Sequence, residues 1–292
     1  MVTPALFMQR PQARPKIGLF RLRAIVTTTI AAILALVFVW PFLCILAATF
    51  NKLDVVMNPL IPIPAKFSLQ FYQLMLGEKY HFQDYIMNSV VVSVSTTVLS
   101  ALASTLSGYA LAKLRFPGRG LLFSIIIGVM LLPTATMLVP QFVVMRELKL
   151  VNSYWGLILP GVGGGAFGIF LMRQFMLNIP TEMLEAARMD GANEFALFSR
   201  IVLPNAKAGI GVIATLSLRG NWNALLWPQL IITDPARQLL MPQIALHNNM
   251  MVEVWAIHVV RTASLVAAIV PLALYAYSQR HFVSTLAGAI KG

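Results

Sequence analysis

The stretch that decides the fold class is residues 24–50, AIVTTTIAAILALVFVWPFLCILAATF, which contains no charged side chain. A helix needs about 20 apolar residues to cross a hydrocarbon core about 30 Å thick, so this run is long enough to span a membrane. Basic residues precede it, but it is too long for the apolar core of a signal peptide. The run therefore predicts a membrane-spanning helix.

The composition of the whole chain agrees with a membrane protein. Of its 292 residues, 58% are hydrophobic and 11% are charged, whereas soluble globular chains have roughly 45–50% apolar and about 25% charged residues. A soluble fold would lack the polar surface to cover so much apolar material. We therefore expect a lipid bilayer as the surroundings and no nucleic-acid partner. The composition disfavours a soluble enzyme and a disordered chain.

Five further apolar runs follow the first, and they lie at residues 88–111, 121–142, 155–176, 206–232 and 259–277. Backbone groups in lipid must be hydrogen-bonded internally, so each run is expected to be helical. The predicted fold is an all-α membrane protein with six transmembrane helices. The predicted organisation is an N-terminal arm 1–23, a membrane domain 24–283 and a tail 284–292.

The positive charges predict the orientation of these spans. With both termini inside, the segments that would be cytoplasmic carry 14 of the 22 Lys and Arg residues, and the opposite segments carry six. Cytoplasmic loops collect Lys and Arg, so we expect both termini to be cytoplasmic. The net charge of +12 then records topology rather than an anionic partner.

One predicted cytoplasmic loop, residues 178–205, has an ordered pattern: NIPTEMLEAARMDGANEFALFSRIVLPN. Pro180 and the acids that follow it are typical of a helix start, and Gly191 is a natural stop. Asn193 can begin a second short helix that Pro204 limits. Phe195, Phe198 and Ile201 would form one apolar stripe on that helix. The pattern predicts two short helices meeting at a glycine, which form either a docking surface or a simple connection.

The spacing of Glu185-Ala186-Ala187, Gly191 and Leu203-Pro204 resembles the loop motif of binding-protein-dependent ABC importer permeases. The fuller string is similar to the second membrane subunit of carbohydrate importers of the maltose type. The resemblance implies a permease subunit of a bacterial inner membrane, without catalytic residues. Its implied partners are a second permease subunit, two ATPase subunits that bind ATP and Mg, and an extracytoplasmic substrate-binding protein.

The resemblance also implies a role for this loop, which would dock in the ATPase and switch the pathway when the ATPase dimer closes. The implied coupling surface consists of Glu185, Ala186, Ala187, Asp190 and Gly191, with Phe198, Ile201, Leu203 and Pro204 setting the second helix. No Gly-x-x-x-x-Gly-Lys-Ser/Thr string occurs in the sequence. ATP hydrolysis is therefore expected on another polypeptide, and we expect no cofactor and no metal on this chain.

The run 206–232 carries polar residues that suit a substrate pathway. Thr215, Arg219, Trp222 and Asn223 are predicted to share one face by their spacing. An Arg inside the bilayer costs about 2.5–3.5 kcal/mol on insertion scales and usually faces water or a partner. Arg219 would either pair with the other subunit or bind an anionic group. The second alternative favours an acidic, uronic-acid oligosaccharide, while a neutral sugar, a polyol or a phosphorylated polyol stays open.

The rival class is a self-contained secondary transporter or channel. Such proteins commonly carry membrane-embedded carboxylates for ion coupling. None of the six predicted spans contains an Asp or Glu. This absence disfavours the rival, and a membrane enzyme is disfavoured because no catalytic set of residues is visible.

Overall fold

The structure is a computed structural model that describes residues 17–52, 58, 60–163, 165–249 and 254–290. Among these residues the secondary structure is helical, and the β pairing is an isolated bridge between Asn51 and Phe67. The chain divides into two compact units, Met1–Ser68 and Leu69–Gly292. Each unit is described separately.

The first unit is built on α1 (Ile17–Thr49). Its segment Arg23–Thr49 is long and apolar enough to cross a membrane, so the first predicted span is confirmed as a candidate. Large apolar side chains are exposed along most of α1, as expected for a helix surrounded by lipid. Within α1, Trp40 donates a hydrogen bond from Nε1 to the Leu60 carbonyl at 3.2 Å, which ties the loop that follows the helix to α1.

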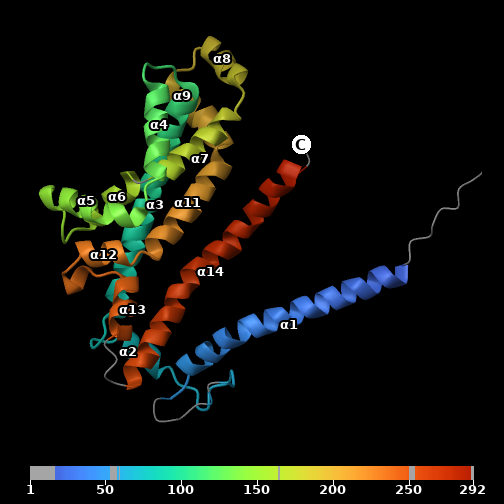
Figure 1. The fold of residues 1–292 in the computed structure, drawn as a ribbon, viewed down its shortest axis with the longest axis vertical. Helices are drawn as coiled ribbons and strands as arrows, with labels where there is room; N and C mark the ends of the chain where they lie inside the picture. Colours follow the sequence, from blue (N-terminus) through green and yellow to red (C-terminus); the bar gives the residue numbers. More distant parts are fainter. Residues whose placement is uncertain (1–16, 53–57, 59, 164, 250–253, 291–292) are drawn as a thin grey trace, which may run out of the picture. The chain divides into compact units, whose positions relative to one another are not determined.

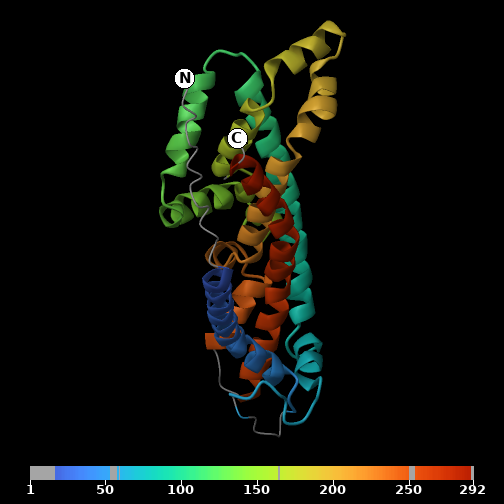
Figure 2. The same cartoon turned by 90° about the vertical axis from the view of Figure 1, so that its right-hand side faces the viewer.

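The second unit is organised around α3 (Phe82–Lys113), which runs along its length (Figures 1 and 2). Two helices pack along α3, namely α7 (Ala166–Leu177) and α11 (Lys207–Trp222). The approach of α3 to α7 is close, because a Cβ added at Gly108 would lie only 2.6 Å from the Met172 Cβ. Small residues allow this contact, as is common between membrane helices.

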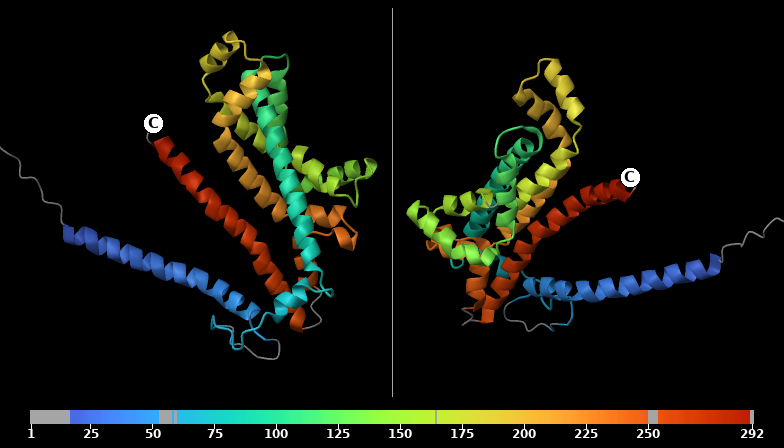
Figure 3. Two further views of the ribbon diagram at one scale, coloured as in Figure 1. Left: turned by 180° about the vertical axis from the view of Figure 1, so that it is seen from behind. Right: turned by 45° about the horizontal axis from the view of Figure 1, so that its top comes forward.

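Several further elements of the second unit contact α3 or α11 (Figure 3). They are α2 (Gln70–Leu76), α6 (Tyr154–Gly163), α13 (Leu240–Asn249) and α14 (Val254–Ile290), with the short 3₁₀ turn η2 (Pro235–Arg237). Candidate spans occur at Phe82–Lys113, Tyr154–Leu177 and Ala256–Tyr277. These three confirm the runs predicted at 88–111, 155–176 and 259–277.

The third predicted span, residues 121–142, is not one straight helix. It forms α4 (Arg119–Met130) and α5 (Thr134–Glu147), which are bent by 110° relative to each other. Pro133 lies at the bend, where it removes a backbone donor and restricts the residue before it. The predicted third run is therefore either a broken span or a re-entrant loop, and it is not one straight helix.

The fifth predicted span, residues 206–232, is also divided. It forms α11, which has 16 residues and ends at Trp222, and the separate helix α12 (Leu226–Ile231). Pro228 has no N–H to give the Ala224 carbonyl, which explains why one helix does not continue through this segment. At 1.5 Å per residue α11 is about 24 Å long, shorter than a full hydrocarbon core.

Length and composition thus give four candidate spans in the described residues, or six when each of two bent pairs counts as one. The second bent pair joins Glu194–Asn205 to Lys207–Trp222 at 73°. The all-helical membrane class is therefore confirmed, and the sidedness of the termini stays a prediction.

Candidate functional site

The segment 178–205 forms two helices that meet at a glycine. The first is α8 (Thr181–Met189), and the second begins as α9 (Glu194–Leu197) and continues through the π-helical turn η1 (Phe198–Val202) into α10 (Leu203–Asn205). Gly191 has a φ of +84°, a conformation that L side chains rarely adopt. Asn193 caps α9, since its Oδ1 accepts a hydrogen bond from the Ala196 N–H at 2.8 Å. Figure 1 shows α8 and α9 at one end of α3.

Most of the predicted coupling residues are open to contact in this chain. Glu185, Ala186, Asp190 and Gly191 are exposed, and Ala187 is half-buried. The sequence reasoning missed the exposed methionine Met189, which has 89% of its surface exposed and lies directly before Asp190. Its signal was an apolar residue on the polar side of a short amphipathic helix.

The predicted apolar stripe on the second helix is not continuous. Phe195 is 78% exposed, but Phe198 and Ile201 pack against a core that includes the fully buried Leu197 and Val202. The π-helical turn shifts the register of the helix, so residues three apart do not stay on one face. Phe198 and Ile201 therefore hold the second helix in place, and Phe195 alone of the three faces outward.

Polar contacts bind this segment to the end of α3. The Tyr109 hydroxyl donates to Glu194 Oε2 at 2.7 Å, and Arg188 Nη2 lies 2.9 Å from Glu194 Oε1. Lys113 Nζ donates to the Ile179 carbonyl at 2.6 Å. The hydrogen bond from Tyr109, followed by that from Arg188, holds the pKa of Glu194 below its ordinary value. Glu194 of α9 thus binds both Arg188 of α8 and Tyr109 of α3, so the two helices of the segment are tied to each other and to α3.

The structure separates the four predicted pathway residues. Trp222 is 4% exposed and donates from Nε1 to the Ala267 carbonyl at 2.9 Å, so it belongs to the core. The prediction that Trp222 shares one pathway face with Arg219 and Asn223 is therefore corrected, because those two side chains are exposed and Trp222 is not. Arg219 and Asn223 are exposed, and Thr215 is half-buried with its hydroxyl donating to the Gly211 carbonyl. The Arg219 guanidinium makes no hydrogen bond or ion pair with another described residue.

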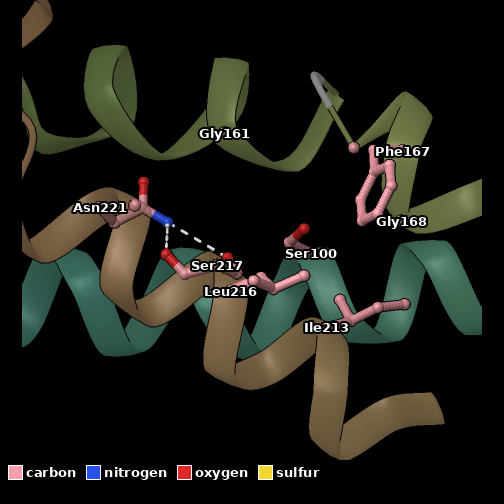
Figure 4. Close-up of a pocket in the computed structure, with 10 residues that line it drawn as sticks. Ser100, Gly161, Phe167, Gly168, Ile213, Leu216, Ser217 and Asn221 are labelled. Carbon is pink, nitrogen blue, oxygen red and sulfur yellow. Dashed lines mark hydrogen bonds between the residues drawn. The ribbon is translucent and has the colours of Figure 1, made fainter. Parts of the chain in front are cut away.

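A cavity of about 260 Å³ lies between α3, α6, α7 and α11, and we call it the α3–α11 cavity (Figure 4). Its polar lining is Ser100 from α3 with Ser217 and Asn221 from α11, and Phe167, Ile213 and Leu216 supply apolar surface. The sequence contained a signal for it, because hydroxyl residues recur along α3 and glycines cluster near residues 161–168. Nothing local indicated that these elements face one another.

The described residues contain no group of three or more His, Cys, Asp or Glu side chains placed to hold a metal ion. The candidate site thus consists of an exposed two-helix loop, a cation on a membrane helix and a mainly apolar cavity that contains a few polar groups. None of these supplies a set of residues for bond-breaking chemistry.

Comparisons with known proteins identify similar membrane chains. The arabinooligosaccharides transport system permease protein AraQ of Bacillus subtilis (strain 168) is 27% identical, over 95% of this chain and 98% of its own length. The polygalacturonan/rhamnogalacturonan transport system permease protein YtcP of the same organism is 31% identical, over 88% of this chain and 94% of its own.

The fold has a solved counterpart. A chain in the crystal structure of a bacterial ABC transporter involved in the import of the acidic polysaccharide alginate matches with a TM-score of 0.77. The match covers 94% of this chain and 100% of that chain at 24% sequence identity, so it shows a shared fold. Residues 100–284, more than half of the chain, match the family model described as binding-protein-dependent transport system inner membrane component. The chain therefore belongs to this family of bacterial inner-membrane transport permeases, as the motif at residues 185–204 predicted.

Proposed function

We propose that this chain is the second membrane subunit of an ATP-driven importer for an oligosaccharide with acidic units. Its implied partners are a second permease subunit, an extracytoplasmic binding protein and two ATPase subunits that bind ATP and Mg. Both termini and the segment 178–205, which we call the coupling loop, would be cytoplasmic. The excess of Lys and Arg on the segments assigned to that side supports this orientation.

The proposal of an acidic substrate rests on the exposed and unpaired side chain of Arg219. Its side chain is exposed on a predominantly apolar helix and has no partner among the described residues. A fixed guanidinium in this position is expensive unless it faces water or an anionic group, and carboxylates are its best-matched ligands. The name of YtcP points the same way, because polygalacturonan carries a carboxylate on each uronic-acid unit.

The coupling role rests on the exposed surface of α8 and on what the sequence lacks. The full chain contains no phosphate-binding loop, so ATP must act through another polypeptide. The exposed residues Glu185, Ala186 and Met189 offer small, apolar and acidic surface to such a partner. ATP can drive transport only if it favours one global state of the complex, and the loop is the element through which that preference would pass.

The test compares two substitutions at Arg219 in the complete complex, reconstituted with its binding protein in liposomes. Arg219→Gln removes the charge, and Arg219→Lys keeps it. Uptake of labelled trigalacturonate should fall about tenfold or more in Arg219→Gln, a loss of roughly 1.4 kcal/mol, and be largely kept in Arg219→Lys. Uptake of trigalacturonate that is equal in wild type and Arg219→Gln would contradict an acidic substrate.

A neutral oligosaccharide is the second candidate, because AraQ is named for arabinooligosaccharides. In that case arabinotriose would be the transported probe, and its uptake would not depend on the charge at residue 219. Arg219 would then pair with the second permease subunit, and Arg219→Gln would weaken assembly instead of substrate selection.

A further inference from the structure

The α3–α11 cavity has polar groups left without partners. Ser100 is 5% exposed as a residue, lines the cavity and makes no hydrogen bond with another described residue. Asn221 uses its Nδ2 to donate to Ser217 O at 2.8 Å and Oγ at 3.2 Å, but its Oδ1 accepts no bond from the described residues. Figure 4 shows these three side chains gathered between α3 and α11. The cavity therefore presents hydroxyl and amide groups with free hydrogen-bonding capacity.

A second unpartnered hydroxyl lies beside the cavity wall. Ser104 is 1% exposed, and its Oγ is buried without a hydrogen-bond partner. It points toward Gly165, where an added Cβ would lie 3.2 Å from Ser104 Oγ and 3.5 Å from Ser100 Oγ. Buried polar groups are normally paired, and an unpaired one costs about 1–3 kcal/mol. Ser100 lines the cavity, and Ser104 lies behind its glycine-lined wall. The cavity is therefore bounded on this side by hydroxyl groups that the described residues leave without partners.

The opposite side of the cavity is apolar and open. Phe167 is 49% exposed and Leu216 is 41% exposed, and both line the cavity. An aromatic ring and hydroxyl groups in one lining match a sugar ring, which has apolar C–H faces and an edge of hydroxyls. The volume of about 260 Å³ lies just below the range of roughly 300–1,000 Å³ for drug-sized ligands. It suits one sugar ring.

Arg219 lies between two lining residues in the sequence of α11 but does not itself line the cavity. Leu216 and Gly220 line the cavity from α11, and Arg219 lies three residues after the first and one before the second. Residues three and four apart are neighbours on a helix surface, so the guanidinium is on the adjoining exposed face. A carboxylate on the ring in the cavity, or on the next ring of the chain, would lie on this side.

We propose that the α3–α11 cavity is a subsite for one ring of the transported saccharide. Ser100, Ser217 and Asn221 would bind ring hydroxyls, and Phe167 would cover an apolar ring face. The proposal rests on the proposed saccharide import and deepens it. It places substrate contacts within this subunit, and it assigns a ligand to side chains that the coupling role does not use.

Gly220 allows the cavity to be filled without disturbing its walls. It lines the cavity, and a Cβ added there would meet no heavy atom within 4 Å. Gly211 is a matched control, because it lies on the same helix, has the same open surroundings and does not line the cavity. Gly220→Leu and Gly211→Leu thus add the same side chain to the same helix, inside and outside the cavity.

The experiment uses the complete complex with its binding protein in liposomes, with labelled trigalacturonate and arabinotriose as probes. Gly220→Leu should lower uptake of the transported probe about tenfold, equivalent to roughly 1.4 kcal/mol, with Gly211→Leu within about twofold of wild type. Both variants should keep the second permease and the ATPase subunits on purification. If Gly220→Leu and Gly211→Leu transport equally well, the subsite is wrong.

A smaller substitution tests the subsite if the complex with Gly220→Leu does not assemble. Ser100→Ala removes a hydroxyl without adding volume, and it should raise the half-saturating probe concentration severalfold while the maximal rate stays near wild type. Unchanged half-saturation in Ser100→Ala would overturn the subsite. Failure of the wild-type complex to transport either probe would instead overturn the proposed function, so the two failures are distinguishable.

Discussion

The two polar regions of α3 differ in how their hydrogen bonds are completed. At the loop end, Tyr109 and Lys113 both find acceptors on the coupling loop, at Glu194 and at the Ile179 carbonyl. In the middle of the helix, Ser93, Thr97 and Ser104 are buried with no partner among the described residues. A polar network in which every group has a hydrogen-bond partner holds its members rigidly together. Buried polar groups without a partner mark a place where a ligand, a water molecule or another chain can supply one.

This difference separates two tasks along one helix. The loop end is suited to transmit a displacement, because two polar contacts and the packing of Phe198 on Tyr109 at 5.5 Å tie the loop to α3. The middle is suited to receive a ligand, because Ser100 lines the α3–α11 cavity and Ser104 lies behind its glycine wall. Removing a hydroxyl should therefore lower the stability of the protein at the loop end of α3 and leave it equal or raise it in the middle of α3.

The largest expected effect comes from the turn of the coupling loop. Gly191→Val places a β-branched residue at a φ of +84°, which costs about 1–3 kcal/mol of backbone strain. The turn between α8 and α9 should change shape, so the ATPase subunits should be lost from the complex purified in mild detergent. The second permease subunit should stay bound.

Gly118→Val is the matched control for this prediction. Gly118 has a φ of +80° and open surroundings, like Gly191, but it lies between α3 and α4. Equal loss of the ATPase in both variants would show that strain in general, and not the coupling loop, controls docking.

The next effect is expected at the contact between α3 and the loop. Tyr109→Phe keeps the buried ring and removes the hydroxyl that Glu194 accepts. The loss should be roughly 1.5 kcal/mol, at the low end for a bond to a charged group because Glu194 is exposed. We expect a lower Tm in detergent and fewer substrate molecules transported per ATP hydrolysed. Tyr154→Phe, at a hydroxyl without a described partner, should change neither quantity.

A smaller effect on stability, opposite in sign to that of Tyr109→Phe, is expected in the middle of α3. Ser104→Ala removes a buried hydroxyl that has no partner, so stability should stay equal or rise by up to about 1 kcal/mol. The neighbouring Thr105→Val removes a hydroxyl that donates to the Ala101 carbonyl at 2.6 Å, and it should lower the Tm. A clear loss of stability in Ser104→Ala would break the contrast between the two regions.

The smallest effect concerns pH. The pKa of Glu194 lies below its ordinary value of 4.5 in the folded protein, so the unfolded chain binds its proton more readily. The stabilisation from Glu194 is therefore fully present above pH 4.5 and is lost as the pH falls through the lowered pKa. The Tm difference between wild type and Tyr109→Phe should narrow as the pH is lowered from 4.5 through the lowered pKa of Glu194. A constant difference across pH would show that the Glu194 charge does not contribute.

Much of the membrane architecture was predictable from local features. The run 24–50 could only be a buried or lipid-facing helix, and four runs are confirmed as candidate spans. Pro133 was visible in the sequence, but its consequence was not, because a proline kinks some helices and ends others according to what packs around it. The 110° bend between α4 and α5 depends on those surroundings.

The candidate site was also predictable only where it depends on residues that are near one another in the chain. Gly191 and Asn193 act on their own backbone, so the two-helix form of the coupling loop follows from nearby residues. The role of Tyr109 did not follow, because Glu194 lies 85 residues away in the chain. Spacing along α11 also placed Trp222 with Arg219, although the two side chains have opposite exposures.

Run length, charge distribution and the spacing at residues 185–204 were enough to predict the all-helical class and the family, because each is a property of a continuous stretch of chain. Which face of α11 is buried was not contained in any such stretch. Trp222 is in the core because Ala267 of α14 accepts its hydrogen bond, and Asn221 reaches a cavity because Ser100 of α3 lies across it. Such pairings join residues far apart in the chain, so only the packed helices establish them.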